Sequence, residues 1–459
     1  MANLYEIQQY NNRKEGDRQK ELYNYYTGND VPIDKRQPVS SAKAESHTNL
    51  HIDFFKDIVE LKVGYMAQKI TPVVSVDSEE LKKRLDDELK SFARTNSLHT
   101  MNSESVRWSS ISGKSHRLCY SENKVFKIKN IPAWQVVYDY KESPLNPTKA
   151  YYFYSQTDLI GNTVNHCDVY DRTTVTYYEA AGNFTSAKES QKPKGDHLSN
   201  NYIKKGEDLH LMGEVPIIPI MNSDLEVGDC DEAVDIMNVY DEVISDTSAE
   251  VKAMRLAYLI MHGDYYTGLD TEGNEIDINT WMKQTSTMRF PAGEDGKRVG
   301  GAEFLEKNIN DTVIENILNR LRTHIYETSG SLDLRELATT ERVFSIKAQM
   351  MRLENTAKSS ESYMRSALYK QTRLWTNFMR EFFNIPVQDI DIDWDFTRVF
   401  PRDLAGEAGT IAQLANTITL EDALTAVGWE NAKEIAERAE EVNTVITDIE
   451  SEEIIDDEE

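Results

Sequence analysis

One central stretch of the chain, from Gly228 to Asn384, constrains the fold more than any other part of the sequence. Its apolar spacing predicts a helix, a polar insert, a second helix, a short loop and then one very long helix. The long helix begins near Arg342, carries apolar residues along one stripe and ends before Pro386. About forty residues at 1.5 Å per residue make a rod of roughly 60 Å, which is longer than a small domain is wide. The two ends of this helix must therefore lie in different surroundings.

The two shorter helices of this stretch have clear end signals. The first starts after Gly228, where Asp229 or Asp231 can cap its free amides, and keeps apolar residues at helical spacing through Tyr258 until Gly263 ends it. The second runs from about Asn308 to Gly330. We therefore expect a pair of helices joined by the insert.

The rest of the chain mixes helical and β-type patterns. Helices are predicted over residues 4–26, 48–66, 79–95, 98–112 and 410–442, the last with an interruption near Gly428. Strands are predicted at 71–76, 125–128, 135–138, 151–154, 164–170, 174–178 and 387–396, with one more candidate, Thr287–Phe290, in the insert of residues 264–307. We expect residues 182–208 to form a polar hairpin or loop and the acidic tail, Ser451–Glu459, to be disordered. The predicted fold class is α+β.

Composition limits the classes of function. The chain has 459 residues, of which 39% are hydrophobic, so it can bury a real core, and its net charge of −27 argues against a broad basic face for nucleic acid. DNA as a passing neighbour stays possible. Cys119, Cys167 and Cys230 form no CxxC pair, which argues against a disulfide scaffold or a zinc site and indicates a reducing compartment. Met1–Asn12 lacks an apolar signal-peptide core and the longest apolar runs are too short to cross a bilayer, so we expect a soluble chain.

Two motifs resemble known sites but fail on their details. Trp108–Ser115 ends like a phosphate-binding loop, yet that motif needs glycine where Trp108 stands and a hydrophobic strand before it. We therefore interpret Gly113 as part of a helix-to-strand turn. His47 and His51 share a helical spacing without a third ligand nearby, so a surface pair is favoured over a metal site.

Four aspartates near the end of the central stretch offer the strongest alternative chemistry. On a strand, residues 389, 391, 393 and 395 would share one face and could form a carboxylate ladder for a divalent cation. A half-buried strand with a solvated acidic face is the favoured interpretation. The sequence has no HExxH, GxSxG or GxGxxG motif and no acid–base or nucleophilic constellation. An enzyme is therefore disfavoured, and we expect neither a cofactor nor a catalytic or metal-binding residue.

The order of several segments resembles portal (head-to-tail connector) proteins of tailed double-stranded-DNA bacteriophages, in particular the siphophage type of Gram-positive hosts. No segment is a catalytic signature, and the resemblance lies in their order across nearly the whole chain. The segments are Leu22–Asn29, Asn49-Leu50 with Lys56–Val59 and Lys62–Met66, Val215–Asn222, Gly228-Asp229, Val239–Asp241 with Ser245-Asp246, Ala257–Ile260 with Gly263, and Phe396–Asp403. One departure concerns the long helix: related chains often open it with Ser-Gly-x-Ala-Leu, whereas this chain has Arg342–Lys347.

The resemblance implies an architecture and a set of partners. It implies a wing (1–228), a stem helix (229–262), a clip (263–307), a second stem helix (308–328), a tunnel loop (329–341), a long wing helix with a strand (342–400) and a crown with an acidic tail (401–459). It further implies a dodecameric ring at one capsid vertex of the virion, assembled in the host cytoplasm, through which DNA is packaged and ejected. The implied partners are the terminase large subunit, a head-completion or adaptor protein, scaffold and major capsid protein, with no membrane.

The residues that would touch DNA follow from the same resemblance. Arg335, Arg342 and Lys347 near the constriction are candidates for brief phosphate contacts, whereas pairing with Glu336, Glu341 or a helix C-terminus is an equal alternative. Deleting residues 332–338 should leave rings assembled and impair packaging or retention of DNA. The competing hypothesis is an intracellular metal-dependent enzyme that uses the Asp389–Asp395 ladder. A monomer or dimer with metal-stimulated hydrolysis would support it, and a ring would not.

Overall fold

The molecule consists of two structural units. The computed structural model describes residues 7, 15–38, 47–139, 147–157, 159–180, 202–210, 212–254, 258–262, 268, 273, 275–285, 290, 300–305, 311–335, 343–385, 387–398, 404–414, 417–427 and 431–439. The larger unit comprises residues 1–339 and 348–397, and the smaller one comprises residues 340–347 and 398–459.

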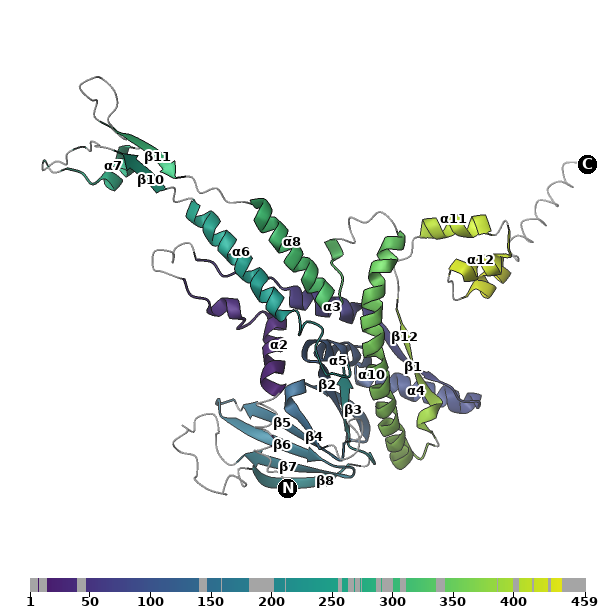
Figure 1. Ribbon diagram of the computed structural model, residues 1–459. Helices are drawn as coiled ribbons and strands as arrows, with labels where there is room; N and C mark the ends of the chain where they lie inside the picture. Colours follow the sequence, from purple (N-terminus) through teal and green to yellow (C-terminus); the bar gives the residue numbers. More distant parts are fainter. Residues whose placement is uncertain are drawn as a thin grey trace, which may run out of the picture. The chain divides into compact units, whose positions relative to one another are not determined.

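Among the described residues, α-helices dominate the start of the larger unit (Figure 1). They are α2 (Asp17–Thr27), α3 (Phe54–Met66), α4 (Glu79–Thr95) and α5 (Leu98–Ser112). The predictions for α4 and α5 are confirmed to the residue, since Ser78 caps α4 through its side chain and Gly113 ends α5. The predicted helix from Thr48 is wrong at its start, because residues 47–53 form no helix and α3 begins only at Phe54.

Two antiparallel sheets form the β-rich part. The first has the order β3-β2-β9 and the second the order β4-β5-β6-β7-β8. Leu118, Ile131 and Ile217 of the first sheet share one buried cluster with Tyr152, Tyr170 and Val175 of the second, so the sheets are joined by a common core. The strands are β2 (Lys114–Glu122), β3 (Val125–Ile131), β4 (Val136–Asp139), β5 (Lys149–Thr157), β6 (Thr163–Tyr170), β7 (Thr174–Ala180), β8 (Tyr202–Leu209) and β9 (Ile217–Met221).

Strand β8 falls within residues 182–208, where we predicted a polar hairpin or loop, and its antiparallel pairing with β7 fits the hairpin alternative. Its side chains are mostly exposed on both faces, so it lacks the apolar alternation that marks a half-buried strand. Antiparallel pairing with β7 supplies the backbone hydrogen bonds that keep it extended. Residues 181–201 lie outside the described residues.

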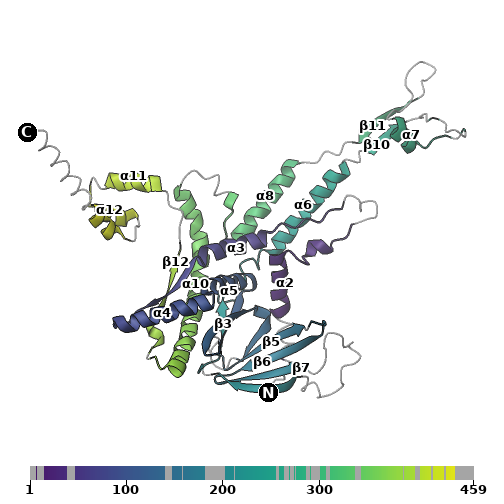
Figure 2. The same cartoon turned by 180° about the vertical axis from the view of Figure 1, so that it is seen from behind.

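The predicted helix pair is present, with one correction (Figure 1, Figure 2). Helices α6 (Val234–Met254) and α8 (Asp311–Thr328) lie side by side, and α8 ends before Gly330, whose φ of 65° suits a glycine cap. The first helix does not continue to Gly263. Residues 258–262 form β10 (Tyr258–His262), which pairs antiparallel with β11 (Gly301–Leu305). A short apolar run cannot be assigned to helix or strand by periodicity alone, and here the pairing decides.

The insert between these helices also contains α7 (Ile278–Thr285). The strand candidate Thr287–Phe290 lies outside the described residues except for Phe290, which is in no strand. Among the described helices, none is both long enough and apolar enough to cross a membrane.

The long helix is α10 (Val343–Phe383), with 41 residues. Its predicted apolar stripe is buried at Met350, Leu353, Ala357, Met364, Leu368, Leu374 and Phe378. Beyond it lies a 3₁₀ turn (Asp389–Asp391) and then β12 (Ile392–Thr397), which pairs antiparallel with β1 (Lys69–Val74). The prediction of one strand over residues 387–396 is therefore wrong for its first half.

The smaller unit is helical where it is described. It contains α11 (Leu404–Leu414), α12 (Leu420–Val427) and a helix over residues 432–439. Leu424, Ala432 and Ala436 form a small buried cluster of its own. The acidic tail from Ser451 lies outside the described residues.

Candidate functional site

The chain enters the helix pair through a tight backbone contact. Gly113 has φ of 79°, and a Cβ on it would overlap the carbonyl oxygen of Glu226; a Cβ on Gly228 would likewise meet the carbonyls that end α5. The Asp229 N–H donates to the Ser110 carbonyl (2.9 Å), so a backbone hydrogen bond joins the end of α5 to the segment before α6. The phosphate-loop look-alike is thus a helix-to-strand turn, as predicted.

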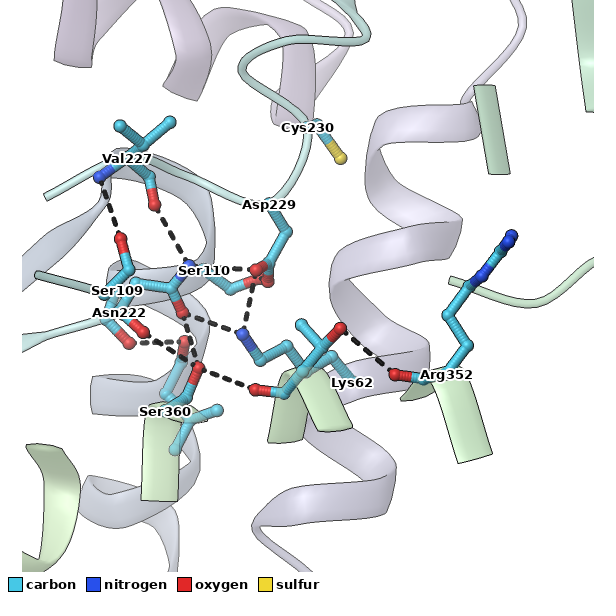
Figure 3. Close-up of polar contacts among 12 residues, drawn as sticks. Lys62, Ser109, Ser110, Asn222, Val227, Asp229, Cys230, Arg352 and Ser360 are labelled. Carbon is cyan, nitrogen blue, oxygen red and sulfur yellow. Dashed lines mark hydrogen bonds and ion pairs between the residues drawn. The ribbon is translucent and has the colours of Figure 1, made fainter. Parts of the chain in front are cut away.

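A buried ion pair stands at this junction (Figure 3). The Lys62 side chain on α3 is 2% exposed, and its Nζ donates to Asp229 Oδ1 (2.8 Å) and Asn222 Oδ1 (2.7 Å). Asn222 Nδ2 donates to the same carboxylate oxygen (2.9 Å), and the Ser110 hydroxyl donates to the other one. Burying the charge of Lys62 or of Asp229 without its partners would cost free energy. The pair therefore depends on all of these side chains at once.

The same network reaches the long helix. The Ser360 hydroxyl of α10 lies 3.0 Å from Asn222 Oδ1 and 3.1 Å from the Asn222 carbonyl oxygen (Figure 3). One polar cluster therefore contacts α3, the end of α5, the segment before α6 and α10. It fixes where the helix pair starts relative to α10.

A second buried cation ties α10 to the β-rich part. Arg117 on β2 is 1% exposed and donates to Gln371 on α10 (2.7 Å), to Asn102 (3.0 Å), to the Met101 carbonyl (2.9 Å), to Ser105 (2.7 Å) and to Asn130 (3.1 Å). Burial lowers the pKa of Arg117 to about 10. Neutral hydrogen-bond acceptors surround the Arg117 guanidinium in a fixed geometry. Arg117 therefore connects these elements structurally and is not a reactive group.

A segment without regular secondary structure, residues 47–53, runs antiparallel to α6. Lys252 Nζ donates to the Thr48 hydroxyl (2.6 Å), the Leu50 N–H donates to the Ser245 hydroxyl (2.9 Å), and the Ile52 N–H donates to Asp241 Oδ1 (3.0 Å). We call this segment the strap. Its contacts fall on 241, 245 and 252, which share one side of the helix.

The strap also changes the interpretation of the two histidines. His51 is not on the surface: its side chain is 14% exposed and its Nδ1 lies 2.7 Å from Asp241 Oδ2. His47 turns elsewhere, with Nε2 3.1 Å from the Arg36 carbonyl oxygen. The predicted surface pair is therefore wrong, because the spacing that suggested one helical face falls in a segment that is not helical.

Beyond the strap, Phe54 connects both helices of the pair. Its ring packs edge-on against Tyr240 of α6 (centroids 4.8 Å apart) and Tyr326 of α8 (6.0 Å). The Arg322 guanidinium lies over the Phe54 ring at 5.4 Å and donates two hydrogen bonds to Asp333, in the segment after α8. This pairing lowers the pKa of Asp333 and raises that of Arg322. The first residues after α8 are thus held back against the helix pair.

A sequence profile described as "Phage portal protein, SPP1 Gp6-like" matches residues 6–447, which is nearly the whole chain. The chain belongs to this family of phage portal proteins. A portal protein of Bacillus phage SPP1 is 22% identical over 203 residues, a region that covers 44% of this chain and 37% of the relative. The match thus spans little more than a third of that relative's length. The predicted resemblance to phage portal proteins is confirmed.

The residues predicted to touch DNA in this portal chain are only partly described. Arg335 has a side chain that is 63% exposed, with Nη2 3.6 Å from Asp333, and its backbone N–H donates to Asp333 Oδ1 (2.9 Å). Glu336 and Arg342 lie outside the described residues, and of Lys347 only the place on α10 is described. The described ion pair of Arg335 is with Asp333, a partner that the sequence did not suggest.

The carboxylate ladder is not assembled. Asp389 pairs with Arg373 (3.1 Å), Asp391 accepts the Gln388 N–H (2.9 Å), and Asp393 accepts the Tyr369 hydroxyl (2.6 Å). Within the described part of the chain, no three or more histidine, cysteine, aspartate or glutamate side chains gather in a way that could hold a metal ion. The favoured interpretation is confirmed for β12, where Ile392 and Trp394 are buried and Asp393 and Asp395 are exposed.

Sequence reasoning missed Lys62, Asp241 and Arg322. Lys62 carried a readable signal, because it falls among buried positions of an amphipathic helix, next to Val59, Val63 and Met66. A lysine there needs a carboxylate partner. Asp241 carried no comparable signal because its partners are far away in sequence, and Arg322 carried none because its partner Asp333, 11 residues on, lies beyond the end of its helix.

Proposed function

We propose that this portal chain assembles as a closed dodecameric ring whose α6 and α8 helices line a channel for double-stranded DNA at one capsid vertex. The observation that carries the proposal is the surface of the helix pair. Val313 and Ile317, four residues apart on one face of α8, are 49% and 42% exposed, and Val239 and Val251 of α6 are 45% and 55% exposed. Adjacent exposed apolar side chains such as Val313 and Ile317 suit a surface that a neighbouring copy covers.

Ring closure by identical copies requires two unlike faces on each copy. A helix pair supplies them, since each flank of the pair can meet the opposite flank of a neighbour. The start of the pair is fixed by Lys62 and Asp229, and the strap holds α6 at Asp241 and Ser245, which supports a constant orientation of the flanks in every copy.

The charge of the chain fits a channel through which DNA moves. A net charge of −27 keeps phosphate groups from adhering to the wall, because like charges repel. Brief contacts would come from a few cations near the narrowest point, for which Arg335, Arg342 and Lys347 are the candidates, with Glu336 as a neighbour. The packaging ATPase would be the terminase, a separate protein.

We further propose the regions and partners that this role implies. The stem would be formed by α6 and α8, and the clip would begin at Tyr258, where β10 starts, instead of at Gly263. The clip would meet head-completion or adaptor proteins, and the ring would also contact the terminase large subunit, scaffold and major capsid protein. The protein would be assembled in the host cytoplasm and retained in the virion.

Electron microscopy and mass measurement of the purified protein test this function. We expect rings with a central opening and particles of about twelve times the 52.6-kDa chain mass. Compact single particles without an opening, from intact protein over a range of salt and concentration, would contradict the proposal.

A further inference from the structure

The contacts of His51 with α6 carry a consequence for the conformation of a single copy. His51 Nδ1 faces the Asp241 carboxylate at 2.7 Å, and a carboxylate only accepts, so Nδ1 bears the proton of this bond. The other ring nitrogen, Nε2, is buried without a hydrogen-bond partner and lies 3.6 Å from Asp53 Oδ1. The ring is thus placed between two carboxylates.

We propose that the contact between the strap, residues 47–53, and α6 is pH-sensitive. It is most stable while the His51 imidazolium lies between Asp241 and Asp53, and it is weakened when that imidazolium loses its proton. In the charged state both ring nitrogens carry hydrogen and both face negative charge. In the neutral state with Nδ1 protonated, the buried Nε2 presents a lone pair toward Asp53. The neutral state therefore leaves two carboxylates near an uncharged ring.

The surrounding charges strengthen this preference. Asp34, in the 3₁₀ turn Pro32–Lys35, adds a third negative charge that acts on the ring. The cations nearby are engaged: Arg36 pairs with Asp246 (2.8 Å), and Lys252 donates to Thr48 (2.6 Å). The hydrogen bond to Asp241 is the main cause that raises the pKa of His51, against the opposing effect of burial.

The sign of the pH effect follows from the raised pKa. The imidazolium contributes stability that is fully present below the unfolded-state pKa of histidine and is lost as the pH rises through the higher folded-state pKa. The strap is therefore expected to be tightest in mildly acidic solution. The contacts of the strap lie within one copy of the chain and do not depend on ring formation.

Amide hydrogen exchange measures directly how stably the strap is bound to α6. The N–H groups of Leu50 and Ile52 donate to Ser245 and Asp241 of α6, so their protection reports how often the strap opens. We expect their protection, corrected for intrinsic exchange, to fall roughly tenfold between pH 6 and pH 9. The Ile128 N–H, which donates to the Asn96 side chain (2.9 Å) far from the strap, is the internal control and should keep its protection.

Two variants test whether deprotonation of the His51 imidazolium causes the loss of amide protection in the strap. His51→Gln keeps a donor without a titrating charge, and its strap protection should not change over this pH range. Asp53→Asn removes an exposed carboxylate, so the fall in protection should move to lower pH. Equal pH dependence in wild type and His51→Gln would overturn the proposal. If His51→Gln does not fold, an unshifted midpoint in Asp53→Asn would overturn it.

Discussion

At the scale of single residues, a few buried polar groups determine how the elements meet. Lys62 and Asp229 are both nearly excluded from solvent, and each is satisfied by neighbours from other elements. A buried pair of this kind contributes little net stability but makes every alternative arrangement costly. Its role is to select one geometry at the start of the helix pair.

Removing one member of this pair should therefore cost more than removing both. We expect Lys62→Ala to lower the free energy of unfolding by about 3–5 kcal/mol, because Asp229 is left as an unpaired buried charge. Adding Asp229→Asn should restore part of that loss. Denaturant unfolding of the three proteins measures it, with Lys56→Ala, an exposed site on the same helix, as the control with a change below about 0.5 kcal/mol. A double variant as unstable as Lys62→Ala would contradict this account.

Two glycines with positive φ allow the backbone contact at the junction to be tested. Gly113 and Gly161 have φ of 79° and 94°, yet a Cβ meets a carbonyl at Gly113 and nothing at Gly161. We expect Gly161→Ala to cost about 1 kcal/mol from backbone strain alone, and Gly113→Ala to cost clearly more. Thermal unfolding of both variants provides the comparison. Equal losses would show that the junction relaxes around the added methyl.

At the scale of elements, the flank of α8 is the surface on which the proposed ring assembly would depend. We expect Val313→Glu with Ile317→Glu to abolish rings while each chain stays folded, because both side chains are exposed in the single copy and a charge buried between copies is costly. Asn319→Glu adds a charge to another exposed position of the same helix and is the matched control. Mass photometry with circular dichroism reads both outcomes. Intact rings in the double variant would place the contact elsewhere.

Elements with local signals were predictable, and elements held by distant partners were not. Helices α4 and α5 carry an amphipathic pattern together with Ser78 and Gly113 at their ends, so their bounds follow from the sequence. Strands β8 and β10 and the strap lack such signals. Strand β8 pairs with the neighbouring strand β7 and lacks only the apolar alternation of a half-buried strand. Strand β10 is held by β11 and the strap by α6, both far away in sequence. The polar cluster around Lys62 was hidden for the same reason, since Asn222, Asp229 and Ser360 come together only in the fold.

At the scale of the whole molecule, the segment after α8 is expected to act on DNA and not on assembly. We expect replacement of residues 336–341 by a Gly/Ser linker of equal length to leave rings intact and to impair DNA packaging or retention. This replacement tests the segment more specifically than deletion of residues 332–338 does, because it keeps the Asp333 contact with Arg322. Packaged genomes are counted per particle, with Asp333→Asn as the control for a loosened anchor. Normal packaging by the linker protein would show that the constriction lies elsewhere.

The strap also has a consequence for synthesis of the chain on the ribosome. Leu50 and Ser245 are 195 residues apart in sequence, and His51 and Asp241 are 190 apart. At typical elongation rates the strap emerges roughly ten to forty seconds before its helix does. The newly made strap is therefore exposed before α6 has been synthesised. Docking of α6 onto the strap is expected to be a late, slow event of folding because it closes a long loop. Translation paused before residue 241 should then yield nascent chains in which the strap is open to proteases, whereas full-length chains should protect it.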